Sequence, residues 1–375
     1  KERKMKIFWR FLFLFMVNTS IFAHYSFLGN VENYKQNPFG ITLECDKNYR
    51  LEIEFLHEKM FRVVLVRPDY KEPLIDYAIS KKEWKAVSLK LEESQDFITI
   101  KSESIDLVIQ KNPCRLTGKN KDGFIISQDD PGMGIGWDGK EVKNWKTITQ
   151  DEKFFGLGEK SGNLDKRWDE WVMWNTDNPH HDNRSDPLYQ SIPFFVGMRN
   201  YKAYGIYFNN SYRTKFNFSA GNYRYYSFSA EGGNLDYFFI YGPEVPDVVK
   251  LYTELTGRTP MPNIWSLGYQ QCRWSYFPDS EVMRIAKTFR EKQIPADVIY
   301  LDIHYMNEYR VFTWDSKRFP NPSELTKKLA EMGFKVVVII DPGVKEDSEY
   351  FVDKEGIFGD HFVKYPDGKL YLGGV

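Results

Sequence analysis

The chain has 375 residues, more than the ~100–200 of a usual single domain, so two domains are expected. Its 51 basic and 52 acidic residues leave a net charge of −1, which argues against a nucleic-acid groove because such a groove needs a basic excess. Aromatic residues make up 17% of the chain. They fit either large hydrophobic cores or platforms for sugar rings, and composition alone does not choose between the two.

The first 23 residues have the pattern of a secretory signal peptide. Lys6 and Arg10 precede a short apolar run at 11–17, and the small residue Ala23 follows it. The run is too short to cross a bilayer, so stable membrane insertion is not expected. A buried strand or an anchor is the alternative interpretation. We predict a signal peptide at 1–23 and a secreted or periplasmic protein.

Residues 24–256 predict an antiparallel β-sandwich. Short alternating segments such as 51–55 and 105–109 are separated by turn clusters, and the same pattern continues at 204–208 and 235–241. Many short strands at hairpin spacing are typical of such a sandwich.

One stretch of this region, 155–186, is different. It is rich in Asn and Asp, contains Trp168, Trp171 and Trp174, and predicts a long ordered loop. Loops of this length in compact domains are usually functional or disordered. Asp177, near the tip of the loop, is therefore a candidate site residue, although an exposed Asp in a turn is often only a turn residue.

A predicted helix at 243–255 is broken by the Gly- and Pro-rich segment 257–262, where we place a domain boundary. Beyond it, predicted strands at 264–270, 298–303 and 336–340 alternate with helical patterns. This spacing is typical of βαβ units and a parallel sheet. Residues 257–375 thus predict a second domain of α/β type.

Polar side chains crowd the end of the second of these strands. Asp302, His304, Tyr305 and Asn307 follow it within six positions, and Asp341 follows the next strand. In a (β/α)8 barrel the site lies at the carboxyl ends of the strands. Two carboxylates at one edge indicate a site for a polyhydroxylated or cationic ligand. A purely structural acid at the strand end is the alternative for Asp302.

Neither the cysteines nor the histidines indicate a metal or a disulfide framework. Cys45, Cys114 and Cys272 are far apart and odd in number, so all three are interpreted as small apolar fillers. His180 and His181 are adjacent without a third ligand at metal spacing, which favours a loop pair. We expect no metal and no organic cofactor.

The predicted barrel is incomplete. Three βα strands fit into 257–375, whereas an eight-stranded barrel needs ~250 residues. The alternatives are a truncated barrel and a smaller fold.

From about residue 40 to its end the chain resembles glycoside hydrolase family 31, the α-glucosidase family. The resemblance lies in segments that occur in the family's order and spacing: FGLGEK (155–160), MWNTD (173–177), YQSIPF (189–194), LGYQQCRW (267–274), LDIHYM (301–306), FTWD (312–315) and VIIDPG (338–343).

The resemblance implies a galactose-mutarotase-like sandwich followed by the first strands of a catalytic (β/α)8 barrel. It implies retaining, exo-acting hydrolysis of terminal non-reducing α-linked glucose from oligosaccharides, with one Asp as nucleophile and a second as acid and base. The family's nucleophile lies in a W-x-D-M-N-E-like motif after the fourth barrel strand, and the acid/base lies further on. Neither motif occurs in these 375 residues, so no catalytic residue is assigned and the chain alone is expected to be inactive.

The resemblance also implies a set of substrate-binding positions. Asp302 matches the aspartate that accepts sugar hydroxyls, and such charge-assisted hydrogen bonds are strong ones. Trp274 matches an aromatic residue that lines the pocket, Ile303 and Ile339 match apolar residues that flank the sugar ring, and Asp177 matches an acid over the mouth of the site.

His304 stands where many relatives have a second Asp and others a His, and it is a candidate for contact with the substrate. Asp341 is a candidate for supporting the floor of the site. Tyr305 and Arg310 are expected to support these residues rather than touch the sugar.

Two further interpretations stay open. The family also contains α-xylosidases, glucan lyases and transglucosylases, which share the fold and differ in pocket details. A non-catalytic carbohydrate-binding protein is the alternative of another class, although a partial barrel would expose strand edges and apolar faces that folded proteins avoid.

Overall fold

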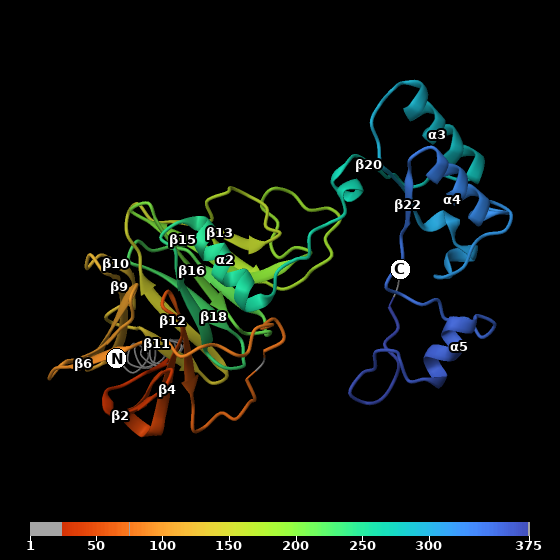
Figure 1. The fold of residues 1–375 in the computed structure, drawn as a ribbon. Coiled ribbons are helices and arrows are strands. Elements are labelled where there is room, and N and C mark those ends of the chain that lie inside the picture. Colours follow the sequence, from red (N-terminus) through yellow and green to blue (C-terminus); the bar gives the residue numbers. More distant parts are fainter. Residues whose placement is uncertain (1–24, 75, 374–375) are drawn as a thin grey trace, which may run out of the picture. The chain divides into compact units, whose positions relative to one another are not determined.

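The computed structural model describes residues 25–74 and 76–373. The chain divides into two compact units, Lys1–Arg258 and Thr259–Val375 (Figure 1). The predicted signal peptide at 1–23 lies outside the described residues.

The N-terminal unit is built on an eight-stranded antiparallel sheet. Its strands, in spatial order, are β13 (Lys153–Gly158), β15 (Ser191–Arg199), β16 (Lys202–Phe208), β19 (Asp236–Tyr241), β5 (Met60–Val66), β4 (Tyr49–His57), β3 (Gly40–Cys45) and β2 (Val31–Asn37). A single 3-10 turn, η1 (Asp46–Asn48), joins β3 to β4. Neighbouring strands along most of this sheet are joined by short hairpin connections.

Two smaller antiparallel sheets complete the sandwich. One has the order β1 (Ser26–Phe27), β11 (Ile135–Asp138), β12 (Glu141–Thr147), β18 (Tyr225–Ala230), β17 (Thr214–Asn217) and β14 (Glu170–Met173). The other has the order β10 (Ile125–Gln128), β9 (Cys114–Asn120), β8 (Ile105–Lys111), β7 (Phe97–Lys101) and β6 (Lys90–Glu93).

Side chains from all three sheets meet in one core, which confirms the predicted sandwich. Strand β4 shows the expected alternation, because Leu51, Ile53 and Phe55 are buried while Glu52 and Glu54 between them are partly exposed. Every second side chain of such a strand faces the core.

Strands β16 and β19 are buried on both faces because helix α2 (Val245–Thr256) covers the outer face of the large sheet. Val248, Leu251 and Leu255 of the helix pack in a second apolar cluster. Tyr252 stacks on Phe194 with ring centroids 3.8 Å apart. The helix predicted at 243–255 is therefore present, shifted by one or two residues.

The segment predicted as one long loop, 155–186, is shorter in the structure. It includes the end of β13 and the whole of β14 (Glu170–Met173), which pairs with β17. Trp171 is buried and donates its indole N–H to the carbonyl of Lys166 at 3.1 Å, whereas Trp168 and Trp174 are half exposed. Strand β14 was not predicted because, of the three tryptophans, only Trp171 belongs to the core.

The C-terminal unit holds a three-stranded parallel sheet with the order β20 (Gln270–Gln271), β21 (Val298–Leu301) and β22 (Lys335–Val338). Helix α3 (Asp279–Glu291) connects β20 to β21, and α4 (Pro322–Glu331) connects β21 to β22. The two connections are the βαβ units that the spacing predicts. Helix α5 (Phe351–Phe358) follows and was not predicted.

The apolar faces of helices α3 and α4 pack in the core of this unit. Val282 and Ala286 of α3 and Leu325 and Leu329 of α4 share one cluster with the strand residue Ile299. At the start of α4 the Asn321 side chain accepts from the Glu324 N–H at 3.1 Å and donates to the Glu324 carboxylate at 3.0 Å. This reciprocal capping fixes where the helix begins.

The strand predicted at 264–270 is wrong for most of its length. Residues Ile264–Leu267 form a 3-10 turn, η2, in which the backbone N–H and the hydroxyl of Ser266 both donate to the Asn263 carbonyl, at 3.0 and 2.7 Å. Ser side chains compete with the hydrogen bonds between β-strands for backbone N–H and C=O groups. Only Gln270–Gln271 pairs with β21.

The interpretation of the cysteines needs one correction. Cys45 and Cys114 are buried and free, as expected of apolar fillers, but Cys272 is exposed. It lies immediately after β20, at the edge of the parallel sheet rather than inside a core.

Candidate functional site

The candidate site is the carboxyl edge of the parallel sheet. Leu301 and Val338 pair in register at the ends of β21 and β22. The Ile339 N–H then donates to the Leu301 carbonyl at 3.0 Å. The residues that follow the two strands, Asp302 and Ile339, therefore leave the sheet side by side, as expected for a barrel site.

Asp302 is held at this edge by its own backbone neighbourhood. One carboxylate oxygen accepts from the Ile303 N–H at 2.7 Å and caps the 3-10 turn η3 (Ile303–Tyr305). The side chain is partly buried, and no cation pairs with it within the described residues. A fixed carboxylate with a free oxygen is available to accept from a ligand.

Cys272 brings the first strand of the sheet to the same place. Burial, and then the charge of Asp302, raise the pKa of the Cys272 thiol. The ends of β20 and β21 therefore contribute neighbouring groups, and the thiol remains largely protonated near neutral pH.

His304 lies in an aromatic setting. Its Nδ1 atom is 2.9 Å from the Ser275 hydroxyl oxygen. Its ring stacks on Phe277 at a centroid distance of 4.7 Å with 14° between the planes, and Trp274 lies 5.9 Å away. Stacking and the hydroxyl contact together fix the orientation of the imidazole. The Trp274 side chain is 72% exposed.

The end of β22 supplies Ile339 and Asp341. Ile339 is 38% exposed, and Asp341 is partly buried without a cation partner in the part of the chain that the structure describes. The buried Tyr305 donates its hydroxyl to the Ile339 carbonyl at 2.8 Å. Burial, and then Asp341, raise the Tyr305 pKa. Tyr305 thus braces this strand end, as expected of a supporting residue.

Arg310 also has a supporting place. Its guanidinium donates to Asp347 at 2.9 Å from Nε and to Glu308 at 2.8 Å. Arg310 is therefore occupied in holding the segment after η4 (Asn307–Tyr309).

Six of the seven predicted positions thus belong to the edge of this one sheet: Trp274, Asp302, Ile303, His304, Ile339 and Asp341. Two further residues, Ser275 and Phe277, contact His304 and were not predicted. A signal for them exists, because both follow β20 as Asp302 follows β21. Because the strand was predicted at 264–270, the position at which β20 ends was not recognised from the sequence.

Asp177 lies in the N-terminal unit, exposed on the segment between β14 and β15. Its carboxylate, after burial, contributes to the raised pKa of Tyr189. The neighbour that the structure gives Asp177, Tyr189, belongs to the same N-terminal unit.

The segment that carries Asp177 is tied down by an ion pair. The ammonium of Lys160, whose side chain is fully buried, lies 2.7 Å from an Asp186 carboxylate oxygen and donates to the Val172 carbonyl at 2.5 Å. The other Asp186 oxygen accepts from the Val172 N–H at 2.6 Å. These bonds join both ends of the segment.

The glycines of the FGLGEK segment bring Lys160 to this position. Gly158 has a φ of +82°, and a Cβ there would lie 2.6 Å from the Gln190 carbonyl oxygen. Only glycine adopts such backbone without strain. The segment therefore acts structurally, by turning the chain at the end of β13.

The edge of the parallel sheet suits a neutral, hydroxyl-rich ligand. It combines two cation-free carboxylates with apolar and aromatic side chains, and such side chains line most small-molecule sites. No group of three or more metal-ligating side chains occurs among the residues the structure describes. None of the described helices is long and apolar enough to cross a membrane.

Comparison with known families gives two matches. Residues 50–217 match the glycosyl hydrolase 31 N-terminal galactose mutarotase-like domain. Residues 259–375 match the glycosyl hydrolases family 31 TIM-barrel domain. Between them the two matches cover most of the chain, and they fall in the two structural units.

Among curated relatives, the chain is 43% identical over 350 residues to alpha-glucosidase 2 of Bacillus thermoamyloliquefaciens, covering 93% of this chain and 44% of that protein. It is 32% identical over 247 residues to an alpha-glucosidase of Saccharolobus solfataricus, covering 66% of this chain and 35% of the relative. The chain therefore spans less than half the length of these relatives.

Among solved structures, a dextranase of family 31 from Flavobacterium johnsoniae, complexed with glucose, is similar with a TM-score of 0.83 and 32% identity. The match covers 92% of this chain and 42% of the dextranase. The predicted architecture, a sandwich followed by part of a TIM barrel, is confirmed by these matches.

Proposed function

Since the chain belongs to glycoside hydrolase family 31, the α-glucosidase family, we propose that its protein is a retaining, exo-acting α-glucosidase. It would release terminal non-reducing α-linked glucose from oligosaccharides. The observation that carries the proposal is Asp302, a carboxylate fixed at the end of β21 with no cation partner among the described residues. The 43% identity to an alpha-glucosidase supports the choice of sugar.

Asp302 would accept hydrogen bonds from two adjacent hydroxyls of the glucose at the cleaved end. Hydrogen bonds to a charged acceptor are worth about 1.5–3 kcal/mol each, and more of that is kept where water is excluded. Ile303 and Ile339 would flank the sugar ring, and Trp274 would line the pocket. The resemblance to the family implies each of these roles, and all four residues lie at the same sheet edge.

The remaining candidates have weaker or more indirect roles. His304, held by Ser275 and Phe277, would reach the substrate from beside Asp302. Asp341 would support the floor of the site after β22. Asp177 would act from the segment that Lys160 and Asp186 anchor, as the family pattern implies.

Retaining hydrolysis needs two carboxyl groups that lie about 5–5.5 Å apart across the glycosidic bond, one as nucleophile and one as acid and base. The family's nucleophile motif does not occur in these 375 residues. We therefore propose that the chain by itself binds sugar without cleaving it. Turnover of an α-glucoside by the purified 375-residue chain would contradict both this proposal and the assigned barrel position.

The experiment that tests the function uses the complete protein. Maltose, isomaltose and an α-xyloside are supplied in parallel, and the products are followed by proton NMR from the first minutes. We expect α-glucose as the first product from the glucosides, which shows retention. Preferred cleavage of the xyloside would instead identify an α-xylosidase, and formation of longer oligosaccharides a transglucosylase.

Export is a separate proposal, and it rests on the pattern at residues 6–23. Expression of the protein with and without residues 1–23 in a suitable host, followed by fractionation, tests it. Export that does not depend on these residues would contradict it.

A further inference from the structure

Two of the three cysteines lie together in the core of the N-terminal unit. Cys45 ends β3 of the eight-stranded sheet, and Cys114 begins β9 of the five-stranded sheet. Both are free, and they are only 1% and 2% exposed. Both belong to the cluster in which the sheets of the sandwich meet. The sequence gives no sign of this proximity, because the two residues are far apart along the chain.

The segment that precedes β2 connects the backbones of the two cysteines. The Cys114 N–H donates to the Gly29 carbonyl at 2.9 Å. The next residue, Asn30, accepts at its carbonyl from the N–H of Asp46 at 3.0 Å and donates its own N–H to the Asp46 carboxylate at 2.9 Å. Asp46 follows Cys45, which itself pairs with the first residue of β2. Consecutive residues of one segment therefore hold the end of β3 and the start of β9 close to each other.

The side chains of the two cysteines are in contact as well. The pKa of the Cys114 thiol is raised well above its ordinary value, first by a hydrogen bond with the Cys45 thiol and then by burial. Cysteines that lie far apart cannot be bridged without movement of the backbone. Two thiols that already share a hydrogen bond, on strands held by the same segment, meet the first requirement for an S–S bond.

The finished core protects both thiols from reaction. The thiolate is the species that attacks a disulfide, and the raised pKa of Cys114 leaves almost no thiolate at neutral pH. Exchange also requires that the oxidant reach the sulfur atom, which burial prevents. A bond between the two cysteines therefore has to form while the chain folds, before the sheets close over β3 and β9.

We propose that Cys45 and Cys114 form a disulfide bond in the exported protein. The oxidant is a protein or small molecule that carries a disulfide of its own. The thiolate of one cysteine attacks that disulfide and releases a first thiol, and the thiolate of the other attacks the mixed disulfide and releases a second. The two cysteines lose two protons and two electrons in total, and the disulfide of the oxidant is reduced to two thiols. Disulfides persist in oxidising compartments, so this inference rests on the proposed export.

The bond would join the two sheets that carry β3 and β9. It closes a loop of roughly 70 residues, and closing a loop of this length restricts the unfolded chain far more than the folded one. We expect the bond to raise the melting temperature of the N-terminal unit by about 5–10 °C.

The test follows the thiols of the complete protein by mass spectrometry. Residues 1–23 are replaced by a bacterial export leader in one form and deleted in the other, so that one form folds in the periplasm and the other in the cytoplasm. Thiols are trapped with acid, alkylated under denaturing conditions, and the proteins are digested. We expect a cross-linked peptide pair that contains Cys45 and Cys114 in the exported form, and alkylation of both in the cytoplasmic form.

Alkylated Cys45 and Cys114 in the exported form would overturn the proposal, as would a bond from either of them to another cysteine. Cys272→Ser is the matched control, since it removes the exposed thiol of the C-terminal unit, and it should give the same cross-linked pair. Because the leader is a foreign one, the outcome does not depend on whether residues 1–23 direct export. Failure of the proposed export and failure of the proposed bond are therefore distinguishable.

A second measurement separates the bond from the packing of the two side chains. Reductant should lower the melting temperature of the exported protein by the same 5–10 °C, on the order expected for a disulfide. The double variant with Cys45→Ala and Cys114→Ala should not respond to reductant. A response of equal size in this variant would overturn the assignment of the effect to these two cysteines.

Discussion

Acidic side chains behave differently in the two units. In the N-terminal unit the four buried acids that the structure describes each face a cation: Asp129 with Lys146, Asp130 with Arg224, Glu152 with Arg199 and Asp236 with Arg62. At the sheet edge of the C-terminal unit, Asp302 and Asp341 have no cation partner among the described residues.

The contrast separates acids that maintain the fold from acids that are available to a ligand. A carboxylate taken out of water costs several kcal/mol unless a cation and hydrogen bonds compensate it. Burial raises the pKa of Asp236 even though Arg62 opposes the shift. Asp302 and Asp341 are only partly buried and have no cation partner among the described residues, so their oxygens are available to a hydroxyl-rich ligand.

The largest effect on stability is expected at Asp236. Its carboxylate accepts from Arg62 at 2.8 and 2.6 Å and from the Asn209 amide at 2.7 Å. Asp236→Ala leaves the guanidinium poorly compensated and should lower the free energy of unfolding by about 3–5 kcal/mol. Urea denaturation followed by tryptophan fluorescence measures the loss.

The matched control is Asp76, which contacts the same guanidinium at 3.0 Å but has a side chain that is 36% exposed. Asp76→Ala should cost no more than about 1 kcal/mol. Equal losses in the two variants would remove the distinction between buried and exposed partners.

A smaller effect is expected at Lys160. Lys160→Met keeps the length of the buried side chain but removes its bonds to Asp186 and Val172. We expect a loss of about 2 kcal/mol, typical of a hydrogen bond to a charged group. Because these bonds anchor the segment of Asp177, proteolysis between 174 and 188 should also become faster. Unchanged cleavage would show that the segment is held by other contacts.

Neutralising the acids at the sheet edge should have almost no effect on folding. Asp302→Asn retains an oxygen that can accept from the Ile303 N–H, and Asp341 makes no ion pair among the described residues. Each Asn variant should change the free energy of unfolding by less than about 0.5 kcal/mol. A loss comparable to that of Asp236→Ala would make these acids structural and would contradict the comparison.

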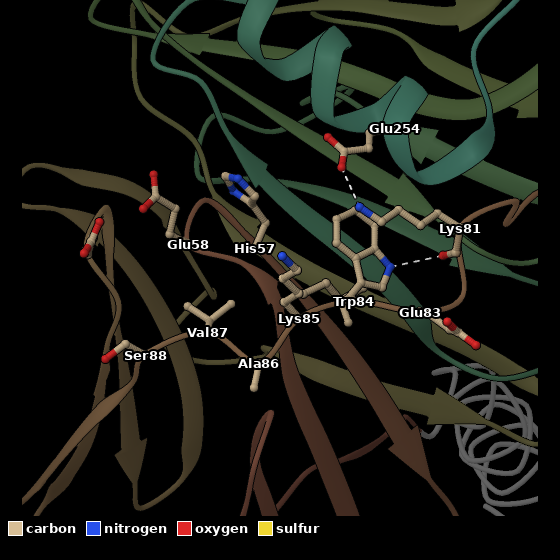
Figure 2. Close-up of a pocket in the computed structure, with 12 residues that line it drawn as sticks. His57, Glu58, Lys81, Glu83, Trp84, Lys85, Ala86, Val87, Ser88 and Glu254 are labelled. Carbon is tan, nitrogen blue, oxygen red and sulfur yellow. Dashed lines mark hydrogen bonds and ion pairs between the residues drawn. The ribbon is translucent and has the colours of Figure 1, made fainter.

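The smallest effect concerns the charged cavity of Figure 2 and its His57. Burial lowers the pKa of His57, and its Nδ1 atom accepts from the Lys59 N–H at 3.1 Å, which requires that nitrogen to be unprotonated. Below the unfolded pKa of about 6.5 the unfolded chain binds the proton more readily, so stability falls as the pH is lowered through this range.

His57→Asn keeps an acceptor for the Lys59 N–H but does not titrate. Unfolding measured at pH 7.5 and pH 5.5 should show a smaller decrease in stability for the variant than for the unaltered chain. An identical decrease would mean that His57 gains no proton on unfolding.

Much of this arrangement could be predicted from the sequence. The alternation at 51–55 predicts a sheet face because it follows a period of two, and the run before Asp302 predicts a buried strand because it is apolar throughout. The position of Asp302 then follows from a general property of parallel sheets, that the ends of the strands lie together.

The failures have physical causes of their own. The segment at 264–270 has apolar residues at strand spacing, but the bonds between Ser266 and Asn263 turn it into η2, and these bonds leave no periodic signal. Strand β14 was not predicted from the sequence because its buried Trp171 lies between two tryptophans that are half exposed. In both cases the secondary structure depends on contacts that form in the folded chain and that the local sequence pattern does not show.

The most direct test of the account compares Asp302 with Asp297, an acid that precedes the same strand at its opposite end. In the complete protein, kcat/KM for maltose is measured for Asp302→Asn and Asp297→Asn, together with melting temperatures. We predict that Asp302→Asn loses about a hundredfold or more with its melting temperature unchanged, because two hydroxyls lose a charged acceptor. Asp297→Asn should retain its activity. Near-normal turnover in Asp302→Asn, or an equal loss in both variants, would contradict the assignment of the sugar site to the carboxyl edge of the sheet.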